Sequence, residues 1–404
     1  MSTLTDPPQG SFRLSMLVND TRYRSYTFQF IALVLLIAAF GYLASNLMSN
    51  LAAAGLNISY EFLGEPAGYD INQRLIEYTS QSSHWRATIV GVLNTLLVAF
   101  LGCLTATILG VIAGVLRLSN NWLISKLMAV YVEAFRNVPV LIWILMINAV
   151  FLILLPQPKA FRGENATASM VMDSVAFTGR GVFFPKPVWE AGSWLVVVTF
   201  LLSLVGIVLF RRYSRQQLFD HGREVKTFLP SLGLFFVPAI LMYFIMGSPI
   251  DVAYPELKGF NFQGGGWARG SLIALWLALS IYTGAFIAEN VRAGIQAISK
   301  GQTEAAASLG LRPGRIMNLV VLPQALRVII PPLISQYLNI TKNSSLAIAV
   351  GYMDITATLG GITLNQTGRA IEAVLLLMLF YLTISLSISA IMNVYNNSVK
   401  LKER

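Results

Sequence analysis

The sequence predicts an all-α fold, a polytopic bundle of transmembrane helices with about eight spans. Three observations support this prediction. Of the 404 residues, 55% are hydrophobic and only 12% are charged, whereas soluble domains usually carry about 25% charged residues. Apolar runs recur that reach the length of about 20 residues needed to cross a bilayer core of about 30 Å. The basic residues also gather in alternate connections between these runs.

The apolar runs place eight candidate spans, at residues 28–48, 88–116, 128–155, 193–210, 228–246, 270–289, 316–339 and 371–394. The first follows a polar lead, residues 1–27. This run is longer than the core of about 7–15 residues in a signal peptide, and no A-x-A site follows it. We therefore expect a retained anchor there.

The second run carries small residues every four positions, at Gly102, Ala106, Gly110 and Gly114. Such spacing gives a flat helix face that another helix can approach closely. The fourth and fifth runs are joined by the basic segment RRYSRQQLFDHGREVK. We expect residues 156–268 to form an outside loop, long enough to carry small structure of its own, followed by an inserted helical hairpin.

The basic residues set the orientation. With the N-terminus inside, 17 of the 29 Lys and Arg residues fall in the inside segments, most of them short, and eight fall in the first, third and fifth connections. The positive-inside rule favours this arrangement, with both termini in the cytoplasm. The net charge of +10 therefore reflects membrane topology, and we expect no nucleic-acid partner.

Several kinds of chemistry have no support in the sequence. There is no G-x-x-x-x-G-K-[ST] phosphate loop, no G-x-S-x-G elbow and no H-E-x-x-H pair. One cysteine, Cys103, and two distant histidines, His84 and His221, offer no metal-ligand spacing, so we expect neither metal nor cofactor. Most spans lack ionisable residues in their interiors, which counts against a proton-driven transporter but leaves sodium coupling through backbone carbonyls open.

Two acid–base pairs stand three residues apart near span ends, Glu133 with Arg136 and Glu289 with Arg292. This spacing places each pair on one helix face, and we expect two ion pairs. Pro139 follows the first pair and should kink or restart its helix.

A short polar helix is expected within EAAASLGLRPGRIMNLVVLP, residues 304–323. Thr303 can cap its start and Glu304 can face the positive end of its dipole. Gly310 suits a left-handed position after its end, and Pro313 prevents its continuation. A helix of about two turns is unstable alone in water. Its alanines would let another protein come close, so it is suited to docking a soluble subunit.

This segment resembles the EAA motif of ABC importer permeases: Glu304-Ala305-Ala306, Gly310, and then Val320-x-Leu322-Pro323, with Val where the family usually has Ile. The segments NTLLVAFLGCLTATILGVIAGVLRLS, EAFRNVPVLIWIL, AENVRAGIQAISKGQTEAAASLGL and TKNSSLAIAVGY resemble the polar amino-acid branch of that family. The length and layout are similar to the general L-amino acid permease group.

The resemblance implies a type I ABC importer permease core made of residues 88–155 and 269–397, with a cytoplasmic coupling helix at about 300–312. It implies a bacterial inner-membrane subunit that lets polar L-amino acids pass and has no nucleotide site of its own. The implied partners are an ABC ATPase dimer, a second permease subunit, different or identical, a periplasmic amino-acid-binding protein and membrane lipid. The implied ATPase-coupling residues are Glu304, Ala305, Ala306, Gly310, Leu322 and Pro323.

The solute path is expected near NITKNSSLAIAVGYMD, a polar break followed by an apolar stretch too short to cross the bilayer. A half-helix beginning near Ser344 would aim backbone N–H groups into a cavity, with Lys342, Asn343 and Ser345 as further donors to a carboxylate. The alternative is that Lys342 reaches the lipid headgroups and the serines cap a helix.

Two other functions stay open from the residues alone. A stand-alone secondary transporter or channel would leave the short polar helix without a role, and transport that survives ATP depletion would favour it. A membrane scaffold that transports nothing would leave solute uptake independent of the gene.

Overall fold

The structure is a computed structural model and describes residues 16–55, 57–163, 166–223 and 225–399. The chain divides into two compact units, Met1–Phe62 and Leu63–Arg404. In the first unit a single turn, α1 (Met16–Asn19), precedes the long helix α2 (Thr21–Ala53). Large apolar side chains are exposed all along α2, as expected for a helix whose surroundings are lipid. This helix contains the first predicted span.

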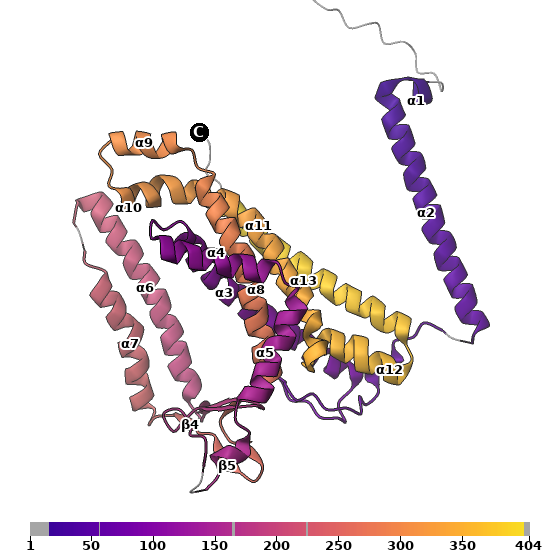
Figure 1. Cartoon of the computed structure of the whole chain (residues 1–404), viewed down its shortest axis with the longest axis horizontal. Helices are drawn as coiled ribbons and strands as arrows, with labels where there is room; N and C mark the ends of the chain where they lie inside the picture. The colour runs from indigo at the N-terminus through magenta and orange to yellow at the C-terminus, as the bar shows by residue number, and fades with distance from the viewer. Residues whose placement is uncertain (1–15, 56, 164–165, 224, 400–404) are drawn as a thin grey trace, which may run out of the picture. The chain divides into compact units, whose positions relative to one another are not determined.

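The second unit is mostly helical (Figure 1). Its α-helices are α3 (His84–Arg117), α4 (Trp122–Arg136), α5 (Val140–Leu154), α6 (Ser193–His221), α7 (Phe228–Ile245), α8 (Gly270–Gln296), α9 (Lys300–Ser308), α10 (Pro313–Ile316), α11 (Leu322–Asn343), α12 (Leu364–Thr367) and α13 (Ala370–Val399). Short 3-10 segments are η1 (Glu61–Gly64), η2 (Pro158–Phe161) and η4 (Ser344–Val350), and η3 (Met317–Val321) and η5 (Thr356–Thr363) are π-helical.

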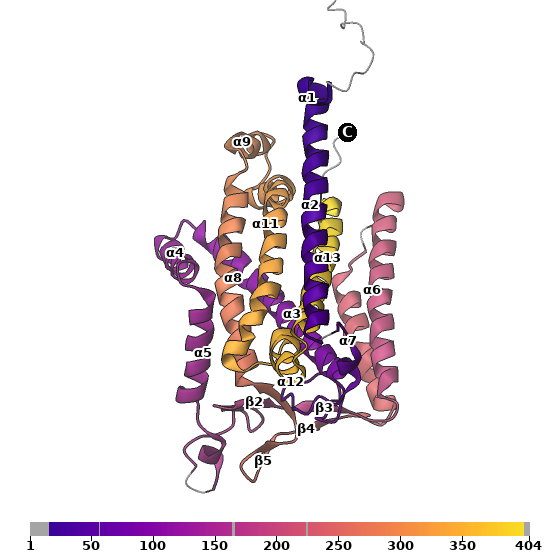
Figure 2. The same cartoon turned by 90° about the vertical axis from the view of Figure 1, so that its right-hand side faces the viewer.

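Across the described residues, seven helices are long and apolar enough to cross a membrane, or eight if α4 and α5 together count as one span. The prediction of about eight spans therefore agrees with the structure. One span is sharply bent: in the predicted span at 128–155, where Pro139 was expected to kink or restart the helix, α4 and α5 meet at 104°. Figure 2 shows α4 lying across the end of α5.

Pro139 is the cause of this break. It precedes α5 with ψ of 136°, an extended conformation, and it has no N–H to donate to the preceding helical turn. The 15 residues of α5 reach about 22 Å at 1.5 Å per residue, which is less than the bilayer core. The predicted kink is confirmed, but its size makes α4 a separate element.

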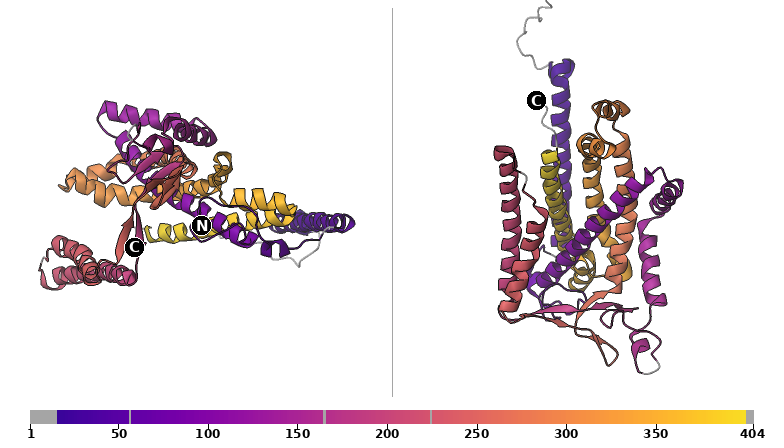
Figure 3. Two further views of the ribbon diagram at one scale, coloured as in Figure 1. Left: turned by 90° about the horizontal axis from the view of Figure 1, so that it is seen from below. Right: turned by 90° about the vertical axis from the view of Figure 1, so that its left-hand side faces the viewer.

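The core of the second unit is built around α8, which α3, α5 and α11 contact. The small-residue face of α3 packs directly on it, and Figure 3 shows the two helices crossing obliquely. A Cβ added at Gly110 would lie 2.5 Å from Cβ of Ile287, and one at Gly114 would lie 2.6 Å from the carbonyl oxygen of Ala288. The close helix packing expected from the four-residue spacing is confirmed.

The connections around α6 and α7 carry small antiparallel sheets. Their strands are β1 (Ala176–Thr178), β2 (Gly181–Phe184), β3 (Lys186–Trp189), β4 (Ile250–Ala253), β5 (Glu256–Lys258), β6 (Asn261–Gln263) and β7 (Gly266–Arg269). The sheet orders are β1-β2-β7, β3-β4 and β5-β6. The expected small structure is present in the loop before the hairpin, as strands β1 to β3, and the connection after the hairpin carries strands that were not predicted.

The strand pairs join the two ends of the predicted insertion. Strands β2 and β3 precede the α6–α7 hairpin, and their partners β7 and β4 follow it. The connections before and after the hairpin therefore lie at the same end of it, as expected for an inserted hairpin. In Figures 1 and 2 the strands lie at one end of the second unit and α9 at the other. We call these the strand end and the α9 end.

Candidate functional site

The α9 end holds the expected short helix, but this helix begins earlier than predicted. It starts at Lys300 after Ser299, and no side chain caps its N-terminus. Thr303 lies inside the helix, where its hydroxyl donates to the carbonyl oxygen of Lys300 at 2.7 Å. The predicted Thr303 cap is therefore wrong, and Glu304 lies beyond the first turn, where the helix dipole acts weakly.

The end of α9 has the predicted geometry. Gly310 has φ of +75°, the left-handed conformation that glycine adopts without strain. Its N–H donates to Ala307 O at 2.9 Å, and the N–H of Leu311 donates to Ala306 O at 3.4 Å. These two bonds form a Schellman motif, which satisfies the last carbonyl groups of the helix. The chain then turns, and Pro313 begins α10.

The corner between α9 and α11 is held by a small apolar cluster. Ala306, Ile316 and Val321 are its buried members, and Ile295, Ile298, Leu311 and Val320 pack against them. The two halves of the EAA segment therefore meet, because Ala306 contacts the stretch directly before Leu322 and Pro323. The expectation that all three alanines face a partner is wrong for Ala306, which is 6% exposed.

The outward face of α9 carries Glu304, Ala305 and Ala307, which are exposed, and Leu309 follows them. Leu309 is 81% exposed, although an isolated leucine usually gains by leaving water. Leu322 is 40% exposed and Pro323 is half-buried. Among the coupling candidates, Glu304, Ala305, Gly310 and Leu322 thus lie on the surface. Leu309 was missed because the motif places no requirement on it.

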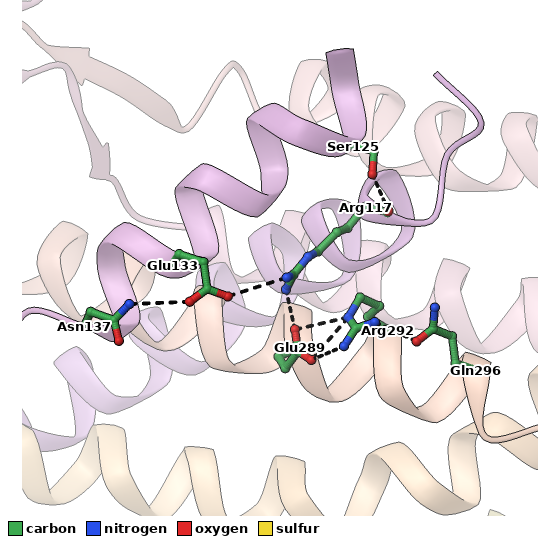
Figure 4. Close-up of polar contacts among 7 residues, drawn as sticks. All are labelled: Arg117, Ser125, Glu133, Asn137, Glu289, Arg292 and Gln296. Atoms are coloured by element: carbon green, nitrogen blue, oxygen red, sulfur yellow. Dashed lines mark hydrogen bonds and ion pairs between the residues drawn. The ribbon is translucent and has the colours of Figure 1, made fainter. Parts of the chain in front are cut away.

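An ion-pair network fixes the helix that leads into α9 (Figure 4). Arg117, at the end of α3, donates to Glu289 on α8, and its second nitrogen lies 3.6 Å from Glu133 on α4. Arg292 pairs with Glu289 at 2.5 Å and donates to Gln296 at 2.6 Å. The network ends four residues before Lys300, so α3, α4 and α8 form one support for the short helix.

The two predicted ion pairs have different outcomes. The Glu289–Arg292 pair is confirmed. The Glu133–Arg136 pair is wrong: Glu133 pairs with Arg117, and the Arg136 guanidinium lies 5.2 Å from the ring centroid of Phe286. Arg136 therefore makes a cation–π contact with α8 in place of the expected ion pair.

The predicted half-helix at Ser344 is not present. The backbone N–H of Ser344 donates to Ile340 O, so α11 continues into η4 without free N–H groups. Ser344 is fully buried, and its hydroxyl donates to Thr341 O at 2.7 Å. Ser345 donates to Lys342 O at 2.7 Å. Lys342 is exposed, and Asn343 and Ser345 are half-buried.

The break in the chain lies further on, after Gly351, whose φ is +68°. The buried Asp354 caps the next helical segment by accepting the N–H of Ala357 at 2.9 Å. Asn94 on α3 donates to Met353 O at 2.8 Å, and Tyr352 donates to Asn94 O at 3.1 Å. Buried polar groups of α3 therefore hold the non-α-helical backbone in place, because buried backbone outside regular structure still needs hydrogen-bond partners.

Two of these residues were missed by sequence reasoning for an identifiable reason. Asp354 resembled a surface loop residue because it follows an apolar stretch and precedes threonines. Asn94 lies in an apolar run, so its contact with residues about 260 positions later has no local signal. Arg327 on α11 was also missed, and its Nε and Nη2 are buried without a partner in the described part of the chain.

Comparisons with known proteins give consistent results. Residues 227–401 match the family "Binding-protein-dependent transport system inner membrane component". The chain is 50% identical, over the full length of both chains, to the glutamate/glutamine/aspartate/asparagine transport system permease protein BztB of Rhodobacter capsulatus. It is 42% identical to the general L-amino acid transport system permease protein AapQ of Rhizobium johnstonii, over 99% of this chain and 98% of that one.

A solved structure described as an amino acid ABC transporter with histidines aligns with 78% of this chain and 95% of its own, at 19% identity and a TM-score of 0.45.

Proposed function

The chain belongs to the polar amino-acid permeases of binding-protein-dependent ABC importers, and from this premise we propose that α9 is the helix on which the ATPase docks. As a permease it is a multi-pass component of the inner membrane and not the ATPase. It passes amino acids through the membrane, and the stand-alone secondary transporter and the scaffold are set aside.

One observation carries the proposal for α9. The helix has an internal support, the cluster around Ala306, and yet presents Glu304 and the 81% exposed Leu309 to its surroundings. An anchored helix with an exposed apolar residue at its end is typical of a surface that another protein covers. Movement of the ATPases on binding and hydrolysing ATP would reach the permease core through α9 and the supported end of α8.

The orientation follows from this docking site. The α9 end faces the cytoplasm, where ATP is available, and the strand end faces the periplasm and the binding protein. Both termini are cytoplasmic. Two permease subunits, identical or different, present two copies of this helix to an ATPase dimer. The basic residues of the segment between α6 and α7 support the same orientation under the positive-inside rule.

The cargo is proposed from the relatives. The permease BztB, 50% identical, is named for glutamate, glutamine, aspartate and asparagine, and we expect cargo of that class. The solute path runs beside Lys342, Asn343, Ser344 and Ser345, at the junction of α11 and η4. There the exposed Lys342 and the half-buried Asn343 and Ser345 offer donors to a carboxylate.

The docking role of α9 can be tested with Glu304→Lys and Gly310→Asp. The first reverses an exposed charge, and the second places a side chain at φ of +75° and disturbs the corner. We expect both variants to reach the membrane at the parental level, to lose more than about nine-tenths of uptake, and to release the ATPase during purification. Glu190→Lys, which reverses an exposed charge at the strand end, is the matched control. Normal uptake by both α9 variants would refute the assignment.

A further inference from the structure

A cavity of about 430 Å³ lies at the strand end, between the strands of the insertion and the ends of α5 and α8. We propose that this cavity binds the carboxylate and ammonium groups of an amino acid on its way into the permease core. The inference rests on the proposed orientation and cargo, and it gives the insertion at 156–268 a role that the EAA motif does not supply. Ligand sites for small molecules usually occupy about 300–1,000 Å³.

The charge of the cavity favours an anion. Arg180 and Arg269 both line it, and no Asp or Glu is among the lining residues. Arg180 donates from one nitrogen to Phe260 O at 3.1 Å. The Arg269 guanidinium makes no hydrogen bond or ion pair with the residues that the structure describes. An arginine side chain binds a carboxylate through two parallel N–H groups, so Arg269 is the principal candidate ligand.

Two of the residues that line the cavity carry a buried polar atom without a partner. Ser271 is 7% exposed, and its Oγ is buried with no hydrogen bond among the described residues. Oδ1 of Asn261 is also buried with no hydrogen bond among the described residues, and Asn261 also lines the cavity. A buried polar atom without a partner is unfavourable, so a native structure normally supplies one. A serine hydroxyl can donate to a carboxylate, and an amide oxygen can accept from an ammonium group.

The fold brings these groups to one place through the pairing of β2 with β7. Gly181 pairs with Arg269 in this sheet and has φ of +134°. A Cβ at Gly181 would lie 2.3 Å from the carbonyl oxygen of Ala268, so the close approach of the two strands requires glycine. Arg180 and Arg269 consequently lie at the same end of the sheet, directly before α8.

The start of α8 adds to the attraction. Gly270 and Ser271 are its first residues and line the cavity. The N-terminus of a helix of 27 residues carries the positive end of its dipole, which favours an anion nearby. The helix dipole therefore adds to the positive charge that Arg180 and Arg269 bring to the cavity.

The cavity also borders the permease core. Asn148 of α5 and Val350 at the end of η4 form part of its wall. Val350 packs against the core cluster that contains Val140, Leu275 and Tyr352. An amino acid bound here would therefore lie between the insertion and the helices that must separate to admit it.

The test measures equilibrium binding of radiolabelled glutamate to the complete transport complex in nanodiscs, without the binding protein. We expect one saturable site in the parental complex, weakened about tenfold or more by Arg269→Gln because the charge-assisted contact is lost. Arg269→Lys keeps the charge but not the paired donors, so it should retain intermediate affinity. Lys186→Gln removes an exposed charge from β3 outside the cavity and should bind as the parental complex does. Glutamate dimethyl ester should not compete.

Three results would overturn the inference: no glutamate binding by the parental complex, equal glutamate binding by Arg269→Gln, or, when the binding protein is added in a second measurement, a defect of Arg269→Gln confined to attachment of that protein. The last would mean that the arginines hold acidic side chains of that protein. ATP-dependent uptake by the parental complex, measured in the same preparation with the binding protein added, separates these results from a failure of the proposed function itself.

Discussion

Arg117 joins three helices through one guanidinium group, because it contacts Glu289 on α8 and Glu133 on α4 from the end of α3. Its side chain is only 17% exposed, so water compensates poorly for a lost contact. Arg117→Gln would leave the partly buried Glu289 with Arg292 as its one ion-pair partner among the residues that the structure describes.

We expect Arg117→Gln to destabilise the protein by about 1.5–3 kcal/mol, the usual contribution of hydrogen bonds to charged groups. The measurement is thermal unfolding of the purified protein in detergent, with Lys126→Gln as the control, because Lys126 is an exposed charge on α4. A melting temperature for Arg117→Gln equal to that of Lys126→Gln would show that the network contributes nothing to stability.

For single residues, spacing along the sequence was sufficient to predict one ion pair and not the other. The Glu289–Arg292 pair could be predicted, since three residues within one helix fix the distance between the side chains. The same rule failed for Glu133 because Arg117, which lies on another element, competes for it. Contacts such as Arg117 with Glu289 span 172 positions, and no local pattern encodes them.

At the scale of single elements, α3 depends on its small residues. A Cβ at Gly110 would lie 2.5 Å from Cβ of Ile287 and 2.9 Å from the carbonyl oxygen of Gly284. The backbone of α8 cannot move away at one residue only, so the two helices would separate. Overpacking of this kind typically costs about 1–3 kcal/mol.

Gly110→Ala should therefore lower the melting temperature and the yield of folded protein. Gly206→Ala is the matched control, because a Cβ at Gly206 has no neighbour within 4 Å and alanine favours a helix. A stability for Gly110→Ala at or above that of Gly206→Ala would show that α3 and α8 are less closely packed than described.

The segment η4 tests the proposed solute path. Lys342→Ala removes an exposed ammonium group beside η4 and should slow glutamate uptake about fivefold, while the ATPase still copurifies. Lys342→Arg retains the charge and should restore most of the rate. Ser344→Ala should also slow uptake, through the loss of the buried bond to Thr341 O. If Lys342→Ala and Ser344→Ala both transport every tested amino acid at the parental rate, the path lies elsewhere.

Element boundaries were predicted less well than element existence. The apolar runs indicated every long helix, but α6 extends through most of the basic segment that was expected to be a connection, because Arg, Gln and Leu favour helix. The helical continuation from α11 into η4 was also not predictable from the polar residues alone. Serine caps a new helix or bonds back to the preceding turn, and here Ser344 does the second.

At the scale of the whole molecule, orientation is the property to measure. In a Cys103→Ala background, which removes the single cysteine, we expect Gln263→Cys at the strand end to react with a membrane-impermeant maleimide in intact cells. Lys226→Cys, between α6 and α7, should react only after the membrane is permeabilised. Both positions are exposed. Labelling of Lys226→Cys in intact cells would reverse the assigned orientation.

The sequence could predict the number of spans, since bilayer thickness acts on each segment separately. It could not predict that the strands on the two sides of α6–α7 pair with each other. Register between β2 and β7 depends on residues about 85 positions apart, and each strand is only four residues long. The cavity between these strands and α8 was out of reach for the same reason.

The pairing of β3 with β4 has a consequence for how such a chain can be assembled in evolution. The N–H of Glu190 donates to Pro249 O at 3.0 Å, so the backbone leaves for the α6–α7 hairpin and returns at nearly one point. A stretch of DNA encoding residues 191–248 could be acquired or lost in a single event, closed by a tight turn, without shifting the register of any helix in the core. The hairpin and the core are thus connected through a single closed point, which is the geometry that a one-step gain or loss of the hairpin requires.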